Sequence, residues 1–164
     1  MKKFICMILT AFSACAVFAC EDCDKKAAST AAQEYINDIS ALLPKFSSFG
    51  KKVKNSIELL DKEKKVIAYL RVAPDKKYER KEGFNNYINT AIVFSTEGKI
   101  LGVVIGKNEE TPRFIEKIRD AGFMKRWNGK TSEQAEKMNV DSISGATWSC
   151  EAIKSEISVI LNEK

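Results

Sequence analysis

The sequence predicts an α+β fold in a single domain, with a twisted, mainly antiparallel sheet packed by an N-terminal and a C-terminal helix. Three patterns support this prediction: an amphipathic stretch near each end of the chain and, between them, short apolar runs separated by turn residues. The 164 residues are 45% hydrophobic and 30% charged, which is ordinary for a globular domain with one core.

The chain begins with a pattern typical of an export signal. Lys2 and Lys3 precede an apolar run that ends at Ala19, too short for a transmembrane helix and typical of a signal peptide. We therefore expect residues 1–19 to be removed. The next residue, Cys20, fits a lipobox and is a candidate lipidated N-terminus; ordinary cleavage after Ala19 is the alternative. Both predict an exported protein, periplasmic or at the cell surface, and lipidation predicts that it is membrane-anchored.

The first half of the domain is predicted to contain a long helix followed by two strands. Residues 20–26 read as a short polar tether, and the domain is expected to span residues 27–164. Apolar residues at helical spacing from Ala28 to Phe46 predict a helix of about five turns that ends near Ser47–Gly50. The predicted strands are Ile57–Leu60 and Val66–Val72, joined through the charged turn Asp61–Lys65.

The second half is predicted to contain a hairpin and two helices. The apolar runs Ile92–Phe94 and Ile100–Ile105 flank the Gly-containing turn Thr96–Lys99, the pattern of a β-hairpin. A helical stretch is expected from Arg113 to Trp127. At the C-terminus, one face of an amphipathic helix is predicted by the apolar residues Ile153, Ile157, Ile160 and Leu161.

A Ser-Gly-Ala-Thr turn opens directly onto this C-terminal helix. The Thr147 hydroxyl is therefore expected where unpaired backbone N–H groups and the positive end of the helix dipole converge, which favours a phosphate. Gly145 and Ala146 carry almost no side chain, so bulky groups can approach the backbone. The structural alternative makes Ser144 or Thr147 an N-cap and Asp141 a loop acid.

Three segments, taken in order, resemble the FMN-binding domain found in the sodium-pumping NADH:quinone reductase, in its C subunit, and in the G subunit of the Rnf complex. They are Glu82–Ile88 with the hairpin that follows, Asn108–Pro112, and Asp141–Thr147. The resemblance covers roughly Gly83 to Leu161. It implies that a flavin transferase, using FAD and magnesium, joins FMN to Thr147 through a phosphoester bond.

The resemblance also implies roles for the residues around the motif. Glu110 and Thr111 are expected by the flavin ring or its ribityl chain, and Asp141 is expected to orient the turn or to help hold magnesium during the transfer. Trp148 is the preferred aromatic partner of the ring because it directly follows Thr147; Phe84, Tyr87 and Trp127 are further candidates. The expected cofactor-binding residues are thus Thr147, Ser144, Gly145, Ala146, Asp141, Glu110, Thr111 and Trp148.

The remaining chemistry-bearing residues do not predict a catalytic or metal centre. The chain has no histidine and its cysteines are not clustered, so we expect no metal site in the protein, with magnesium used only during flavin transfer. Cys150 is expected to be a small buried residue rather than a redox partner. The formal charge of +5 falls to about +3 without the signal, too weak a bias to indicate nucleic acid.

The expected function is extracytoplasmic electron transfer through covalently bound FMN, by a carrier or redox subunit rather than a self-sufficient enzyme. The expected partners are a flavin transferase and a membrane-associated redox donor or acceptor. The alternative is a surface-tethered binding lipoprotein that keeps the fold without the flavin.

Overall fold

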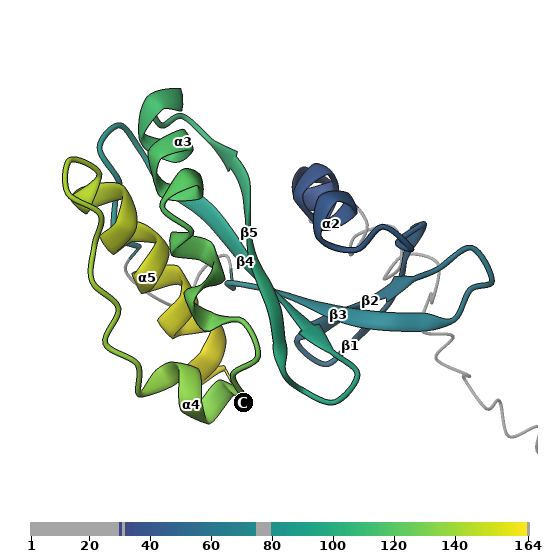
Figure 1. Ribbon diagram of the computed structural model, residues 1–164. Helices are drawn as coiled ribbons and strands as arrows, with labels where there is room; N and C mark the ends of the chain where they lie inside the picture. Colours follow the sequence, from purple (N-terminus) through teal and green to yellow (C-terminus); the bar gives the residue numbers. More distant parts are fainter. Residues whose placement is uncertain (1–29, 31, 75–79, 164) are drawn as a thin grey trace, which may run out of the picture.

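An antiparallel sheet runs through the computed structural model, which describes residues 30, 32–74 and 80–163. The predicted signal peptide, the tether and Cys20 lie outside the described residues. The five strands pair in chain order, each antiparallel to the next, so the predicted antiparallel sheet is confirmed (Figure 1). The strands are β1 (Ser48–Val53), β2 (Ser56–Leu60), β3 (Val66–Val72), β4 (Ile88–Ser95) and β5 (Ile100–Asn108).

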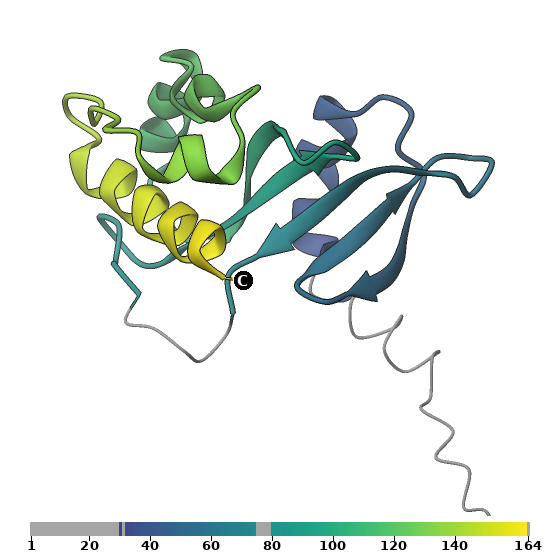
Figure 2. The ribbon, with the colours of Figure 1, turned by 90° about the horizontal axis from the view of Figure 1, so that it is seen from below.

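Strand β4 contributes to hydrophobic clusters on both faces of the sheet. Ile88, Ile92 and Phe94 belong to the cluster shared with the C-terminal helices. Ala91 and Val93 belong to the second cluster, shared with the N-terminal helix. Successive side chains of a strand point to opposite faces, so one strand serves both layers. The N-terminal and C-terminal helices accordingly lie on opposite sides of β4 and β5 (Figures 1 and 2).

The N-terminal helix is shorter than predicted. It comprises η1 (Gln33–Tyr35) and α2 (Ile36–Leu42), and it does not reach Phe46. Leu43 leaves the helical conformation with φ −125° and ψ 87°, because the residue before Pro44 is sterically disfavoured there. The following residues form β1, which the prediction assigned in part to the helix end.

The helix predicted from Arg113 to Trp127 is two elements. Helix α3 (Pro112–Asp120) ends at a turn in which Gly122 has φ +63°, and η2 (Phe123–Trp127) follows. A left-handed residue interrupts an α-helix, and glycine adopts that conformation without a Cβ clash.

Two further helices complete the second layer. The short helix α4 (Ser132–Glu136) was not predicted; Thr131 and Gln134 form a capping box at its start. Helix α5 (Thr147–Asn162) confirms the predicted C-terminal helix, and its four predicted apolar positions are buried. Within the described ranges, no helix has both the length and the apolar character needed to cross a bilayer.

Candidate functional site

The Ser-Gly-Ala-Thr segment forms a tight turn at the start of α5. The Ala146 N–H donates to the Ile143 carbonyl at 2.9 Å, which leaves Ser144 and Gly145 at the two central positions. Gly145 has φ +75°, the left-handed conformation that the third position of a type II turn requires. The turn delivers Thr147 as the first residue of the helix, with an exposed side chain.

No side chain caps the N-terminus of α5. The N-cap residue is Ala146, whose methyl group cannot accept a hydrogen bond, and the first turn contains no acidic residue. The N-cap alternative for Ser144 and Thr147 is therefore not what the structure has. The hydrogen bond from the Cys150 N–H to the Ala146 carbonyl, 3.0 Å long, begins the helical ladder. The N–H groups of the three preceding residues lie ahead of that ladder, and such groups attract anions.

A lysine from another helix lies beside this turn. A Cβ atom added at Gly145 would be 2.8 Å from the Lys117 Nζ atom, so α3 places an ammonium group against the glycine backbone. The sequence interpretation did not include Lys117, because 28 residues separate it from Gly145 and only tertiary packing brings them together. Its positive charge adds to that of the helix N-terminus, and both favour a phosphate at this point.

Exposed aromatic side chains continue the surface next to Thr147. Trp148 is 65% exposed and Phe84 is 56% exposed. The two rings are 6.1 Å apart, and Phe84 also meets Phe114 edge to face at 5.2 Å. A soluble domain rarely leaves adjacent large aromatics in water without a use, and their faces suit a planar ring.

The other predicted aromatic partners lie elsewhere. Trp127 is buried in the core against Phe123, with ring centroids 5.3 Å apart. The Arg80 guanidinium lies over the Tyr87 ring at 4.7 Å. The aromatic surface beside Thr147 therefore consists of Phe84, Phe114 and Trp148, and of these Phe114 was not predicted.

Glu110 ties the parts of this site together. Its carboxylate is buried and accepts hydrogen bonds from the Asn85 N–H at 2.9 Å and from the Ser149 hydroxyl at 2.8 Å. It comes so close to Gly83 that a Cβ atom there would clash. Thr111, the N-cap residue of α3, accepts a hydrogen bond from the Asn85 side chain at 3.3 Å. Glu110 thus links the loop that carries Phe84 to the start of α5, with both of its oxygens engaged within the protein.

The segment that enters the turn is held by its own polar contacts. The exposed Asp141 accepts a hydrogen bond from Arg126 through its main-chain carbonyl, at 2.6 Å. Ser142 donates to Glu151 at 2.6 Å, and Lys154 donates to the same carboxylate at 2.7 Å. The hydrogen bond from Lys154, followed by that from Ser142, lowers the pKa of Glu151 to about 2. Among the residues described, no three His, Cys, Asp or Glu side chains converge as a metal site would require.

Cys150 contributes to packing, as predicted. Its side chain is fully buried, and its Sγ atom accepts a hydrogen bond from the Ile143 N–H at 3.4 Å. Burial raises the pKa of the thiol, so it remains protonated at neutral pH.

The comparison with protein families identifies the region that contains this site. Residues 83–161 match the model of the FMN-binding domain, from the Phe84 loop to the buried end of α5. The match indicates a flavin-binding redox protein with FMN as the cofactor. A comparison with curated proteins gave no match to the chain.

Proposed function

We propose that this chain, whose residues 83–161 belong to the FMN-binding domain family, is an exported electron-transfer protein that carries FMN in a phosphoester bond to Thr147. The position of Thr147 is the observation that carries the proposal. Its hydroxyl-bearing side chain is exposed at the first residue of α5, inside the matched region and beside main-chain N–H groups that no side chain caps.

The residues around Thr147 fit both ends of the cofactor. The N–H groups at the start of α5 and the Lys117 ammonium suit a phosphodiester, which carries one negative charge; the helix terminus alone contributes about 0.3–1 kcal/mol. Phe84, Phe114 and Trp148 offer apolar faces to the ring system. Bound FMN supplies the redox chemistry, while the protein supplies position and electrostatics.

The proposed attachment is a phosphoryl transfer inside a flavin transferase. Thr147 Oγ1 forms a bond to the phosphorus of the FMN half of FAD, and the pyrophosphate P–O bond to the AMP half breaks. AMP leaves, and the hydroxyl proton passes to a base of the transferase or to water. Magnesium, bound in the transferase, neutralises the pyrophosphate. The open turn supports this step, because Ser144, Gly145 and Thr147 are all exposed to a docking enzyme.

Export gives the covalent bond a purpose. The signal-like residues 1–19 and the candidate lipidated Cys20 support a location outside the cytoplasm. A freely dissociating flavin is lost there, whereas a phosphoester retains it. We accordingly propose a membrane-associated redox partner, reached by a protein that works as a carrier or redox subunit.

The decisive experiment is co-expression with a flavin transferase, followed by intact mass and fragmentation. We expect the wild type to gain the mass of FMN less one water on the Thr147 peptide, with a yellow colour that survives denaturation. Thr147→Val removes the hydroxyl but keeps the shape, and it should lose the adduct while its circular dichroism stays unchanged. Ser144→Ala, which removes the neighbouring hydroxyl, is the matched control and should keep the adduct.

Two results would contradict the proposal. One is a covalent flavin retained by Thr147→Val, which would assign the attachment to another residue. The other is an unmodified wild type beside a transferase proven active on a control substrate. That second result would favour the binding lipoprotein that keeps the fold without the flavin.

A further inference from the structure

The positive charge of the described chain is concentrated outside the FMN-binding domain. Residues 83–161 contain ten basic and ten acidic residues, so their formal charge is zero. Residues 45–65 contain seven lysines against three acidic residues, Glu58, Asp61 and Glu63, a formal charge of +4. We call this segment, which comprises β1, β2 and the turns beside them, the basic wing. Its lysines, all exposed, are Lys45, Lys51, Lys52, Lys54, Lys62, Lys64 and Lys65.

The lysines of the basic wing have no acidic partners within the described part of the chain. The ion pairs found there involve Arg80, Lys81, Arg119 and Lys154, none of which belongs to the wing. Lys64 donates instead to the Ser48 hydroxyl at 3.2 Å. The ammonium groups are thus available to an external anionic surface.

Lysine occupies two turn positions that favour other residues. Lys54, after β1, has φ +53°, and Lys64, before β3, has φ +64°. Glycine or asparagine adopts this left-handed conformation at lower cost than lysine does. The chain therefore keeps a charge at both turns despite a local conformational penalty, as proteins do where a residue serves a function.

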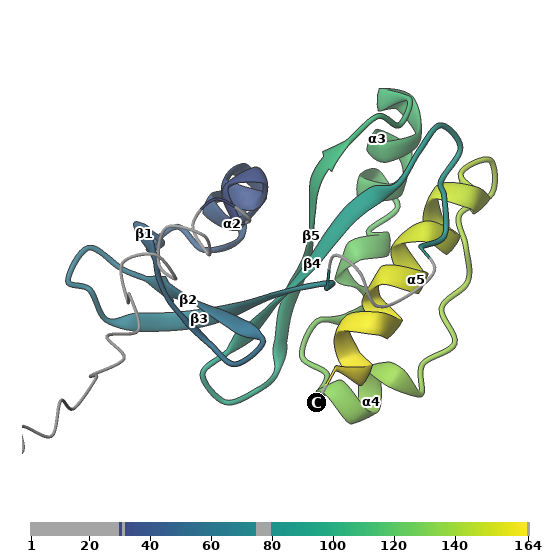
Figure 3. The ribbon, with the colours of Figure 1, turned by 180° about the vertical axis from the view of Figure 1, so that it is seen from behind.

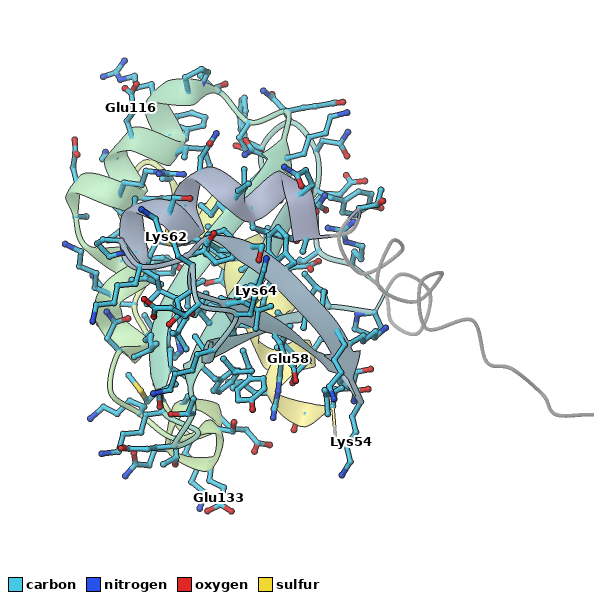
Figure 4. All side chains as sticks on the ribbon, turned by 90° about the vertical axis from the view of Figure 1, so that its right-hand side faces the viewer. Lys54, Glu58, Lys62, Lys64, Glu116 and Glu133 are labelled. Atoms are coloured by element: carbon cyan, nitrogen blue, oxygen red, sulfur yellow. The ribbon has the colours of Figure 1, made fainter. Side chains whose placement is uncertain are left out.

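The wing projects away from the flavin-binding layer. It lies on the opposite side of β4 and β5 from α5 (Figures 1 and 3). Figure 4 faces this side, and the labelled side chains Lys54, Lys62 and Lys64 are spread across it together with Glu58. A redox partner docked here would be remote from Thr147, so an acidic electron-transfer partner is a poor fit to this surface.

From these observations we infer that the basic wing binds the anionic phospholipid surface of a membrane. Only ten residues separate Cys20 from Thr30, a span of at most about 35 Å when fully extended. A lipid at Cys20 would hold the wing close to the bilayer, where each lysine within about 8 Å of the surface gains from the negative potential. Wing-first docking leaves the proposed flavin site on the side that faces away from the membrane.

Protection of the sheet edge explains only part of this pattern. Charged residues on an edge strand discourage pairing with another chain, and β1 is an edge strand that carries Lys51 and Lys52. The lysines in the two turns do not guard that edge, and their unfavourable conformations remain unexplained by it.

The test is lysine footprinting of the chain as the cell exports and processes it. The protein is mixed with vesicles of phosphatidylcholine alone, or of phosphatidylcholine with phosphatidylglycerol, and acetylated briefly before peptide analysis. With phosphatidylglycerol, we expect the reactivity of Lys54, Lys62 and Lys64 to fall about fivefold, the factor that corresponds to the binding energy of one lysine. Lys130 and Lys137, which flank α4 in the other layer, should keep their reactivity.

Two double variants separate charge from folding. Lys54→Asn with Lys64→Asn removes two charges while asparagine relieves the left-handed conformations, so the variant should be at least as stable as the wild type. It should lose the protection of Lys62 that phosphatidylglycerol confers. Lys130→Asn with Lys137→Asn removes the same charge from the other layer and should leave that protection intact.

Salt gives an independent check. Raising the ionic strength from 0.1 M to 1 M shortens the screening length from about 10 Å to about 3 Å and should abolish the protection. Equal lysine reactivity on both vesicle types at low salt would overturn the inference. So would protection that the Lys54 and Lys64 double variant retains in full.

Discussion

The hydrogen bond from Ser149 to Glu110 is expected to be a principal stabiliser of the proposed flavin site. Both side chains are buried, at 1% and 6% exposure, and the Oγ–Oε2 distance is 2.8 Å. A buried hydrogen bond to a charged group contributes about 1.5–3 kcal/mol. Alanine also gains up to about 0.5 kcal/mol of helix propensity over serine. Ser149→Ala should therefore lower the free energy of unfolding by about 1–2.5 kcal/mol.

Glu110→Ala should cost more, because it removes two hydrogen bonds. The Asn85 N–H and the Ser149 hydroxyl both lose their acceptor, for a combined loss of about 3–5 kcal/mol. The double variant then isolates the pair: once Glu110 is absent, Ser149→Ala has no bond left to break. We expect a coupling energy of about 1.5–3 kcal/mol.

Urea unfolding of the flavin-free protein, followed by circular dichroism, measures all four free energies of this cycle. Ser144→Ala provides the control, since the exposed Ser144 hydroxyl has no hydrogen bond among the described residues, and its effect should stay within about 0.5 kcal/mol. Additive single-variant effects, with a coupling energy below about 0.5 kcal/mol, would refute the reasoning. Reduced flavin transfer to Glu110→Ala at a temperature where it remains folded would show that the same link positions Phe84 and α5.

Three further predictions concern the turn and its surroundings. The Glu151 pKa is lowered from 4.5 to about 2, so its ionised form stabilises the fold above about pH 4.5 and that contribution is lost as the pH falls through about 2; Glu151→Gln should flatten the fall in unfolding free energy over that window. Burial of Cys150, with its raised pKa, predicts that iodoacetamide labels the thiol only after denaturation, and labelling of the native protein would contradict this. Gly145→Ala should cost about 1–2 kcal/mol and impair flavin transfer, because it strains a left-handed residue and displaces Lys117; Gly98→Ala, at φ +80° with open space around it, should cost similar stability but leave transfer unchanged.

Periodicity predicted the elements whose burial is simple. The α5 helix presents an apolar face at regular spacing, and β3 is bounded by turn residues on both sides, so both agree with the structure. Strand β1 escaped prediction because its burial pattern does not alternate: it is an edge strand with three exposed residues in succession. The ends of α2 and α3 depended on single residues, Pro44 and Gly122, whose breaking effect outweighs a continuing apolar pattern.

The attachment turn could be predicted from the sequence, but most of what surrounds it could not. Gly145 and Thr147 are close together in the chain, and a turn before a helix has a recognisable composition. Lys117, Phe84 and Phe114 reach the turn from other segments, which only the packing of α3 and the Phe84 loop brings together. Glu110 was expected at the cofactor, whereas its oxygens bind Asn85 and Ser149 within the protein.

The openness of the aromatic surface explains why a covalent bond suits this site. Trp148 and Phe84 remain more than half exposed, so a ring placed against them would stay partly in water. Aromatic contacts of about 0.5–1.5 kcal/mol each, with about 0.3–1 kcal/mol from the helix terminus, add up to only a few kcal/mol. Association itself costs at least about 4 kcal/mol, so free FMN should bind Thr147→Val with a dissociation constant of about 1 mM or weaker. Flavin fluorescence titration measures this constant; micromolar binding would mean that the site encloses the ring more completely than these side chains do.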